Sequence, residues 1–406
     1  MKKIYFILLV LIFFVGISAV SAAENITDSD CSLEMDSLNE VEIASEVGYV
    51  EKNIETNSVI ENSNQNSLLG SDNSAGSRNK ATQVPGKAIT NNVKSTYGTP
   101  VKYSLKLLDK SGKIIADKLV TFKIGKKSYE IRTDSEGVAT LNLNYAAGKY
   151  TIQYSVGGLT GTNTYTVQNK ISMTILKWGN KGDVSKIKAL KKNMPNNAWV
   201  KKAVAAAKKG NPLLKFEGGK GKIVFVTAGV HGNELSSQVA VMKLIAYLSK
   251  HPIKGTVYVI PFVNIKAITH KVRHTGADYN RIAHKSGTIP NKIVKLVVKY
   301  GCDSYGDFHT TQPGGVPGKN IAMGSKSPTA KSAKIVKYIA KHAKVNKRIY
   351  KYAGEQYPGA IEDNVNKRGI PAVLCEVVLP HNTVTAKSVK TSYAMMRLLL
   401  KFNSVI

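Results

Sequence analysis

The chain is poor in cysteine, and this limits how the fold can be stabilised. Cys31, Cys302 and Cys375 are an odd number among 406 residues, and their spacing matches no zinc or redox pattern. We therefore expect no disulfide scaffold and a fold held by its hydrophobic core, for which 43% hydrophobic residues suffice. Cys302 and Cys375 lie in apolar runs, where we expect small buried side chains rather than metal ligands.

Long hydrophobic runs are absent after the first 22 residues, so no later segment is expected to span a membrane. Residues 1–22 combine two lysines, an uncharged run from Ile4 to Val20 and a small residue at Ala22, which is typical of a secretory signal peptide. An uncleaved anchor is the alternative, because the 17-residue run approaches the roughly 18 residues that cross a bilayer. In both interpretations the rest of the chain is exported, so we predict a secreted or cell-surface protein of the envelope.

Acidic residues are scarce and unevenly distributed. The formal net charge is +31, yet residues 23–82 contain twelve acidic and three basic residues, a net of −9. The rest of the chain is therefore strongly cationic, and we expect it to suit anionic envelope polymers or lipid headgroups. A solvated lysine-rich face without a specific partner is the alternative, and export argues against nucleic acid as a partner.

Composition and periodicity divide the chain into parts. Residues 23–82, rich in Asn, Ser and Glu, bury too little apolar surface to fold and predict a disordered acidic tether. Residues 83–168 alternate with period two between turn residues, which is typical of an all-β sandwich. Their "TDSEGVATLNL" and "AAGKYTIQYSVGG" resemble the immunoglobulin-like repeats of bacterial and archaeal surface proteins, which implies a spacer or adhesive module. Residues 169–185 are interpreted as a linker.

Residues 186–406 predict an α/β domain. Apolar runs such as "GKIVFVTAG" and "TVYVIPFVN" are typical of strands buried on both faces, and helical patterns such as "SAKIVKYIAKHA" lie between them. This alternation favours a mixed, mostly parallel sheet flanked by helices, in which sites gather at the carboxyl ends of strands. His231, Asn264, His309 and Glu376 follow or end such runs.

His231 and Glu234, in "VTAGVHGNELSS", form a candidate metal-binding pair. With 8 histidines and 27 acidic residues in 406, about 0.5 such pairs are expected by chance, so the spacing alone is weak evidence. A catalytic zinc site takes three protein ligands, and one common set is two histidines and a glutamate. His309, which ends a buried run in "GDFHTT", is the best placed of the other histidines to be the third ligand.

Arginine is rare, since only seven of the 58 basic residues are arginine. "HKVRHTGADYNR" contains two of them, Arg273 and Arg281, with Asp278 and Asn280 between them. One guanidinium can stabilise a developing oxyanion, and another can bind a carboxylate together with an amide. A solvated basic loop is the alternative.

Glu376, in "AVLCEVV", is a carboxylate inside an apolar strand. Such a group must be hydrogen-bonded, paired or functional. Burial would raise its pKa and a nearby zinc ion would lower it, which suits a general base at neutral pH. A structural ion pair with a lysine is the alternative.

The order of these motifs resembles that of a known family. "HGNE", "RHTGADYNR", "DFHTT" and "CEVV" follow one another as in the zinc carboxypeptidase superfamily, particularly its branch of succinylglutamate desuccinylase and aspartoacylase. The resemblance spans roughly residues 186–406 and implies the fold of that superfamily. It also implies one zinc ion, bound by His231, Glu234 and His309.

The resemblance further assigns roles around the metal. It implies that Arg273 polarises the scissile carbonyl and that Glu376 is the general base. It also implies that Asn280 and Arg281 bind the carboxylate of the substrate.

Three residues receive weaker assignments. The resemblance suggests Tyr357 as a mobile catalytic tyrosine, with Tyr350 and Tyr352 as alternatives. Asp278 is expected to shape its loop, and Asp307 is expected to orient a metal ligand.

Together the motifs predict an exported zinc-dependent metallocarboxypeptidase that removes a C-terminal residue from a cell-envelope peptide. The first alternative is an N-acyl-amino acid amidohydrolase, so the expected substrate is a peptide or an N-acyl-amino acid with a free carboxylate. The second is a surface adhesin with an inactive hydrolase domain, against which the complete set of ligands, base and arginines argues. Residues 186–406 are fewer than in digestive carboxypeptidases, so the specificity pockets of those enzymes are not expected.

Overall fold

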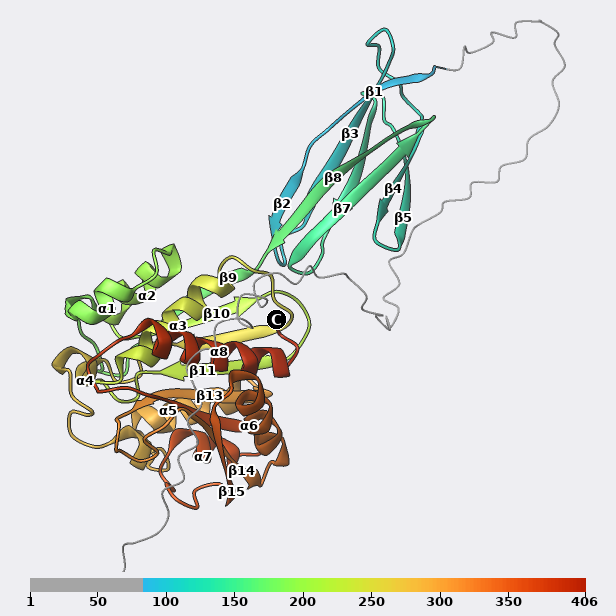
Figure 1. Cartoon of the computed structure of the whole chain (residues 1–406). Coiled ribbons are helices and arrows are strands. Elements are labelled where there is room, and N and C mark those ends of the chain that lie inside the picture. The colour runs from blue at the N-terminus through green and yellow to red at the C-terminus, as the bar shows by residue number, and fades with distance from the viewer. Residues whose placement is uncertain (1–82) are drawn as a thin grey trace, which may run out of the picture. The chain divides into compact units, whose positions relative to one another are not determined.

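The computed structural model describes residues 83–406 (Figure 1). The predicted signal peptide, residues 1–22, and the predicted tether, residues 23–82 with Cys31, lie outside the described residues. In the described part of the chain, no helix is both long and apolar enough to cross a membrane.

The first described part consists of two β-sheets around one core. The strands are β1 (Pro85–Thr90), β2 (Val93–Thr96), β3 (Val101–Asp109), β4 (Leu119–Ile124), β5 (Lys127–Arg132), β6 (Val138–Leu143), β7 (Gly148–Val156) and β8 (Leu159–Gln168). One sheet has the order β1-β3-β6 and the other the order β2-β8-β7-β4-β5. Alternate residues such as Leu105, Phe122, Ile152 and Tyr165 are fully buried in the shared core. The predicted all-β region is therefore present, and its immunoglobulin-like character stays a prediction.

An eight-stranded mixed sheet organises the rest of the chain. Its strands are β9 (Lys170–Leu176), β10 (Asn211–Glu217), β11 (Ile223–Ala228), β12 (Thr256–Ile260), β13 (Ser304–Thr311), β14 (Ile321–Ser327), β15 (Asn346–Tyr352) and β16 (Ala372–Val378). Their order is β15-β14-β16-β13-β11-β12-β10-β9, and four of the seven neighbouring pairs are parallel. The fold class is thus the predicted mixed, mostly parallel sheet.

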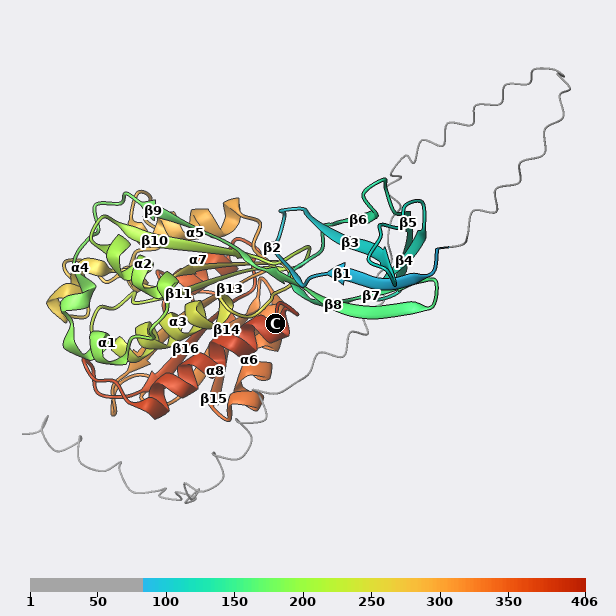
Figure 2. The ribbon, with the colours of Figure 1, turned by 90° about the horizontal axis from the view of Figure 1, so that it is seen from above.

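Helices cover both faces of this sheet (Figures 1 and 2). They are α1 (Lys188–Asn193), α2 (Ala198–Ala207), α3 (Leu235–Leu248), α4 (Ile265–His270), α5 (Ile289–Lys299), α6 (Ala330–Ala343), α7 (Ile361–Asn366) and α8 (Ala386–Phe402). Helices α5 and α7 pack in a smaller core on one face, and the others pack in a larger core on the opposite face. Strand β13 serves both cores, because Phe308 belongs to the larger one and Tyr305 to the smaller one.

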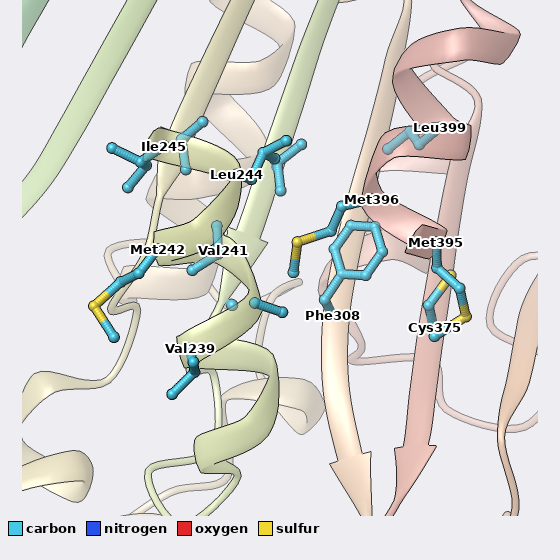
Figure 3. Close-up of a cluster of buried hydrophobic side chains, with 14 of the residues drawn as sticks. Val239, Val241, Met242, Leu244, Ile245, Phe308, Cys375, Met395, Met396 and Leu399 are labelled. Carbon is cyan, nitrogen blue, oxygen red and sulfur yellow. The ribbon is translucent and has the colours of Figure 1, made fainter. Parts of the chain in front are cut away.

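Part of the larger core lies between α3, α8 and the sheet (Figure 3). There Phe308 and Cys375, from β13 and β16, lie near Met395 and Met396 of α8. Cys302 and Cys375 are 6% and 1% exposed, as predicted for small buried side chains. Burial raises the pKa of the Cys302 thiol to about 12, so this thiol is unreactive at neutral pH.

One strand lies in the segment interpreted as a linker. Strand β9 forms the edge of the eight-stranded sheet and pairs antiparallel with β10 from Lys170 to Leu176. Its Ile171 and Met173 pack against the larger core. The partner strand begins 35 residues after Leu176, at Asn211, so no local hairpin signal marks this run as a strand.

The predicted site residues lie at one edge of the sheet. The parallel strands β12, β11, β13 and β16 end there, because parallel neighbours share a direction. His231 follows β11, Asn264 follows β12, and His309 of β13 is opposite Glu376 of β16 in the strand register. Asn264 has a structural role, since its Oδ1 accepts a hydrogen bond from the Ala267 N–H and caps α4.

Candidate metal centre

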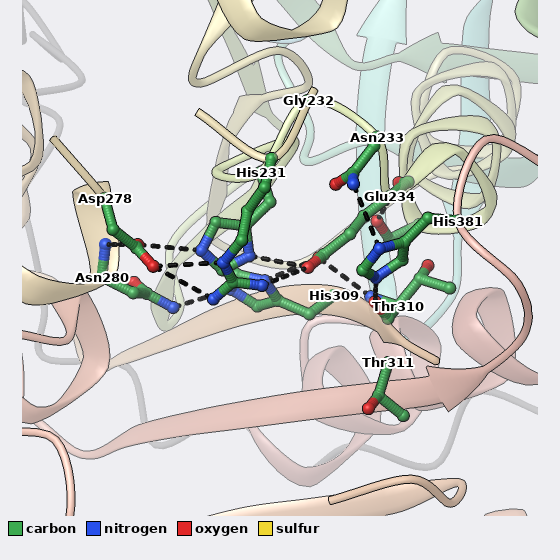
Figure 4. A network of polar contacts seen from close by, with 12 residues as sticks. His231, Gly232, Asn233, Glu234, Asp278, Asn280, His309, Thr310, Thr311 and His381 are labelled. Atoms are coloured by element: carbon green, nitrogen blue, oxygen red, sulfur yellow. Dashed lines mark hydrogen bonds and ion pairs between the residues drawn. The ribbon is translucent and has the colours of Figure 1, made fainter. Parts of the chain in front are cut away.

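Two histidines face one glutamate at the carboxyl ends of β11 and β13. His231 Nδ1 lies 2.6 Å from Glu234 Oε1, and His309 Nδ1 lies 2.8 Å from Glu234 Oε2 (Figure 4). The three side chains are buried, and one potential ligand atom from each lies within 4.8 Å of the other two. The structure therefore brings the three predicted metal ligands into one group that could hold an ion.

Close backbone packing holds the first two ligands in place. The Gly232 N–H donates to the Arg273 carbonyl oxygen at 3.0 Å. A Cβ on Gly232 would lie only 2.1 Å from the carbonyl carbon of Ala267 in α4. Glycine is thus required where this loop crosses α4, and the loop delivers Glu234 to the N-cap position of α3.

An aspartate lies behind each histidine. His231 Nε2 is 3.0 Å from Asp278 Oδ1, and His309 Nε2 is 3.1 Å from Asp307 Oδ2. When the Nε2–H of a neutral His231 donates to Asp278, its Nδ1 keeps a lone pair that points toward Glu234. Two imidazole nitrogens and one carboxylate, all buried and convergent, are a donor set that fits a zinc ion.

The group is highly charged for its burial. Burial alone would raise the pKa of Glu234, but His231 and His309 hold that pKa well below its ordinary value. Burial alone would lower the pKa of His309, but Asp307 and Glu234 raise it well above its ordinary value. In the protein alone, the proton on His309 balances part of the buried negative charge, and a bound cation would take over that role.

Arg273 lies at the rim of the group. Its guanidinium forms ion pairs with Asp278 Oδ2 at 3.1 Å and with Glu234 Oε1 at 3.5 Å, and its side chain is 40% exposed. Asp278 also accepts a hydrogen bond from the Asn280 N–H at 2.9 Å, so it shapes its loop as predicted. Its contact with His231 was not expected from the sequence, and it links the loop to the ligand group.

Glu376 lies on the strand next to that of His309. Its Oε2 is buried and has no hydrogen-bond partner, so the lysine pair considered as an alternative does not satisfy that oxygen. Burial and the charge of Glu234 raise the pKa of Glu376 to about 8. This carboxylate faces the same cavity as the metal ligands.

Asn280, Arg281 and Tyr357 form a second group. The Asn280 Nδ2 lies 3.3 Å from His309 Nε2, and its Oδ1 accepts a hydrogen bond from the Ile361 N–H at 3.4 Å. Arg281 donates through Nη1 to the Asn280 carbonyl oxygen at 2.9 Å. The guanidinium of Arg281 lies 4.2 Å from the ring centroid of Tyr357, a cation–π contact that positions it.

A cavity of about 200 Å³, open to solvent, joins these groups. Seven of the eight predicted site residues line it, namely His231, Glu234, Arg273, Asn280, Arg281, Tyr357 and Glu376. His309 is 1% exposed and contacts the second oxygen of Glu234. Of the alternative tyrosines, Tyr350 also lines the cavity, whereas Tyr352 is 53% exposed and does not.

The other residues that line the cavity include His381 and Glu362, which sequence reasoning did not place in the site. His381 Nε2 is 3.1 Å from the Thr310 carbonyl oxygen, and its Nδ1 is 3.0 Å from Asn233 Nδ2. It follows β16 by three residues, as His231 follows β11, so the strand-end rule could have found it. Glu362 lies in the short helix α7 and carries no such signal.

The fold and the site together define the class of the protein. It is an α/β protein with a buried His-Glu-His group that can hold a metal, at the carboxyl ends of parallel strands and open to a cavity. Residues 220–290 match the family model of the succinylglutamate desuccinylase/aspartoacylase catalytic domain. The match confirms the resemblance predicted from the sequence, and it covers His231, Glu234, Arg273 and Arg281. It supports an enzyme of the hydrolase class.

Three solved structures are similar to the chain at low sequence identity. The product-bound ectoine utilization protein of Ruegeria pomeroyi is 18% identical over 49% of this chain and 64% of its own, with a TM-score of 0.41. An aspartoacylase family protein of Mesorhizobium loti is 17% identical over 58% and 68%, with a TM-score of 0.40. A succinylglutamate desuccinylase/aspartoacylase of Rhodobacter sphaeroides is 21% identical over 49% and 61%, with a TM-score of 0.38. The chain thus spans about two thirds of the length of these structures, and no curated protein matches it.

Proposed function

We propose that residues 186–406 form a zinc-dependent hydrolase that cleaves an amide bond in a substrate with a free carboxylate. The observation that carries this proposal is the buried group of His231, Glu234 and His309 beside a solvent-open cavity. Three protein ligands of this kind leave one position of a tetrahedral zinc ion open, which is typical of catalytic sites rather than structural ones.

Each side chain around the metal group has a separate role in the proposed reaction. A bound zinc ion would polarise the scissile carbonyl and lower the pKa of the attacking water. Glu376, whose Oε2 has no other partner, accepts the proton of that water and delivers it to the leaving nitrogen. Arg273 donates hydrogen bonds to the carbonyl oxygen as negative charge develops on it. Arg281, held by Tyr357, binds the substrate carboxylate together with Asn280.

The finer proposal is an exported metallocarboxypeptidase that acts on peptides of the cell envelope. The apolar N-terminus of the sequence and the cationic composition of the remainder support it, because anionic polymers or lipid headgroups would keep such a protein near its substrate. The family match favours a second candidate, an N-acyl-amino acid amidohydrolase with the same machinery, because that family is named for enzymes of this type.

The test of the hydrolase proposal combines metal analysis with product analysis. We expect the purified full-length protein to carry one zinc ion, and we expect His231→Ala and His309→Ala to lose it. Absence of stoichiometric zinc from the wild type, or its retention by both variants, would contradict the proposal. Incubation with envelope peptides and with N-acyl-amino acids, followed by mass spectrometry, separates the two candidates by whether a C-terminal amino acid or an acyl group is released.

A further inference from the structure

One buried carboxylate in the cavity has no part in the proposed mechanism. Glu362 is 8% exposed and lines the cavity, and its Oε2 has no hydrogen-bond partner. Burial raises the pKa of Glu362 well above its ordinary value, and the charges of Asp363 and Asp307 raise it further. A buried carboxylate oxygen without a partner destabilises the fold, so Glu362 needs a reason to be there.

Within residues 83–406, the fold supplies no salt-bridge partner for Glu362. Two cations of this region have other neighbours. Arg348, which also lines the cavity, opposes the rise in the pKa of Tyr350 that burial causes. Burial raises the pKa of Asp363 to about 6, and the charge of Lys367 opposes that rise. The free oxygen of Glu362 is therefore available to a cation that enters the cavity from outside the protein.

Glu362 lies directly beside the residues proposed to bind the substrate carboxylate. The N–H of Ile361, its neighbour in the chain, donates to Asn280 Oδ1 at 3.4 Å. A Cβ on Gly359 would lie 2.1 Å from the Arg281 carbonyl oxygen, so the segment before α7 packs closely on the Arg281 backbone. A substrate residue whose carboxylate is held by Asn280 and Arg281 would have its side chain near Glu362.

Apolar side chains form another part of the cavity wall. Met323, Leu374 and Tyr350 all line the cavity and pack together in one small cluster. Such a wall suits the methylene groups of an aliphatic chain, whereas the buried carboxylate suits a positive charge at the end of that chain.

We propose that this part of the cavity is a specificity pocket for an aliphatic side chain that ends in an ammonium group, with Glu362 as its counter-ion. The proposal rests on the proposed hydrolase function, and it names the substrates as peptides or N-acyl-amino acids whose carboxylate-bearing residue is lysine or ornithine. A charge-assisted hydrogen bond between the ammonium group and Glu362 would satisfy the free oxygen. A neutral side chain of equal length would leave it unsatisfied, which is how the pocket discriminates.

The test compares lysine with norleucine, which has a similar aliphatic chain without the ammonium group. Matched pairs of peptides and of N-acetyl amino acids are hydrolysed by the full-length, zinc-loaded protein, and binding of free L-lysine and L-norleucine is measured by calorimetry. We expect kcat/KM and binding to favour lysine about 10- to 100-fold. Cleavage at equal rates would overturn the pocket and leave the hydrolase function intact. If neither compound is cleaved, the hydrolase function fails, and calorimetry alone supports the pocket by a lysine preference or overturns it by equal binding.

Variants of Glu362 test the same assignment. Glu362→Gln keeps the shape of the side chain and removes its charge, so we expect the preference for lysine over norleucine to fall to near one. Glu362→Lys is expected to shift the preference toward a C-terminal glutamate, an effect that a merely structural role would not produce. The control Glu130→Gln removes an exposed carboxylate of β5 and is expected to change neither the activity nor the preference. An unchanged lysine preference in folded Glu362→Gln would overturn the pocket.

Discussion

At the scale of single residues, the site depends on the hydrogen bonds and ion pairs that orient each side chain. The Nδ1 atoms of the two histidines face Glu234, while Asp278 Oδ1 and Asp307 Oδ2 lie 3.0 Å and 3.1 Å from the corresponding Nε2 atoms. Glu376 differs, because its Oε2 has no hydrogen-bond partner and is free to exchange a proton.

The first residue-scale prediction concerns this base. Glu376→Gln retains the size of the side chain but cannot accept a proton, so we expect kcat/KM to fall by about 10²- to 10⁴-fold with zinc content unchanged. Metal analysis and steady-state kinetics on one preparation check both parts, with Glu130→Gln as the control. Activity equal to that of the wild type would remove the general-base assignment.

The second residue-scale prediction concerns the crossing of the ligand loop and α4. Gly232→Ala would place its Cβ 2.1 Å from the Ala267 carbonyl carbon, so the loop must move and carry Glu234 with it. We expect zinc affinity to fall by at least about tenfold, in the range found when the groups that orient metal ligands are altered. Competition with a zinc chelator measures the change.

Gly287→Ala is the matched control for this prediction. Gly287 has a φ of +79° and open space around its Cβ position, so alanine there strains only the backbone. We expect it to lower the unfolding free energy by about 1 kcal/mol and to leave zinc affinity unchanged. Equal zinc affinity in Gly232→Ala and Gly287→Ala would show that the close packing at Gly232 does not position the metal ligands.

At the scale of secondary-structure elements, the amino ends of β11 and β13 are joined opposite the site. Asp303 Oδ1 accepts from Lys222 Nζ and its Oδ2 accepts from the Ile223 N–H, both at 2.8 Å. The carboxylate thus fixes the start of one strand against the other. Because these strands carry His309 and precede His231, their alignment determines whether the ligands meet.

The contacts of Asp303 make the stability of the fold depend on pH. Burial would raise the pKa of Asp303, but hydrogen bonds from Lys222 and Ile223 lower it below its ordinary value. The charged form therefore stabilises the fold above about pH 4, and that stabilisation is lost as pH falls through the lowered pKa. We expect Asp303→Asn to cost about 1 kcal/mol at pH 7 and progressively less below pH 4, measured by urea unfolding.

Asp117→Asn is the control for the joint between the strands. Asp117 pairs with Arg132 at 3.2 Å, but its side chain is 85% exposed, so we expect a change below about 0.5 kcal/mol at any pH. An Asp303→Asn deficit that stays constant from pH 7 to pH 3 would contradict the linkage to this carboxylate.

At the scale of the whole molecule, the all-β core and the two cores of the mixed sheet have no residue in common. A metal bound at His231 and His309 would therefore stabilise the mixed sheet and leave the all-β core unaffected. With free zinc at about 100 times its Kd, the stabilisation amounts to about 2.7 kcal/mol.

Metal removal provides the whole-molecule prediction. We expect chelation to lower the melting temperature of one calorimetric transition, that of the mixed sheet, and to leave a second transition in place. In His309→Ala, the temperature of this transition should be the same with and without zinc. A chelator that shifts neither transition, or both alike, would contradict a single metal site in the mixed sheet.

Much of the mixed sheet and its site could be predicted from the sequence. Buried parallel strands are recognised by unbroken apolar runs, and sites lie at their carboxyl ends. That rule suffices to place His231 and His309 together. The contact of Asp278 with His231 could not be predicted, because it depends on how a long loop folds back over α4. Glu362 was missed because α7 has six residues, too few to show which face is buried.

Strand β9 has a practical consequence for dividing the chain. A single residue, Asn169, separates β8 from β9, and its side chain donates to two carbonyl oxygens and accepts from the Ile253 N–H. A fragment that starts at residue 186 would therefore lose an edge strand of the sheet and expose the hydrogen-bonding groups of β10. Unpaired edges invite strand addition between molecules, so such a fragment would be prone to self-association. A catalytic fragment should therefore begin at Asn169, so that it keeps the segment that composition alone would assign to a linker.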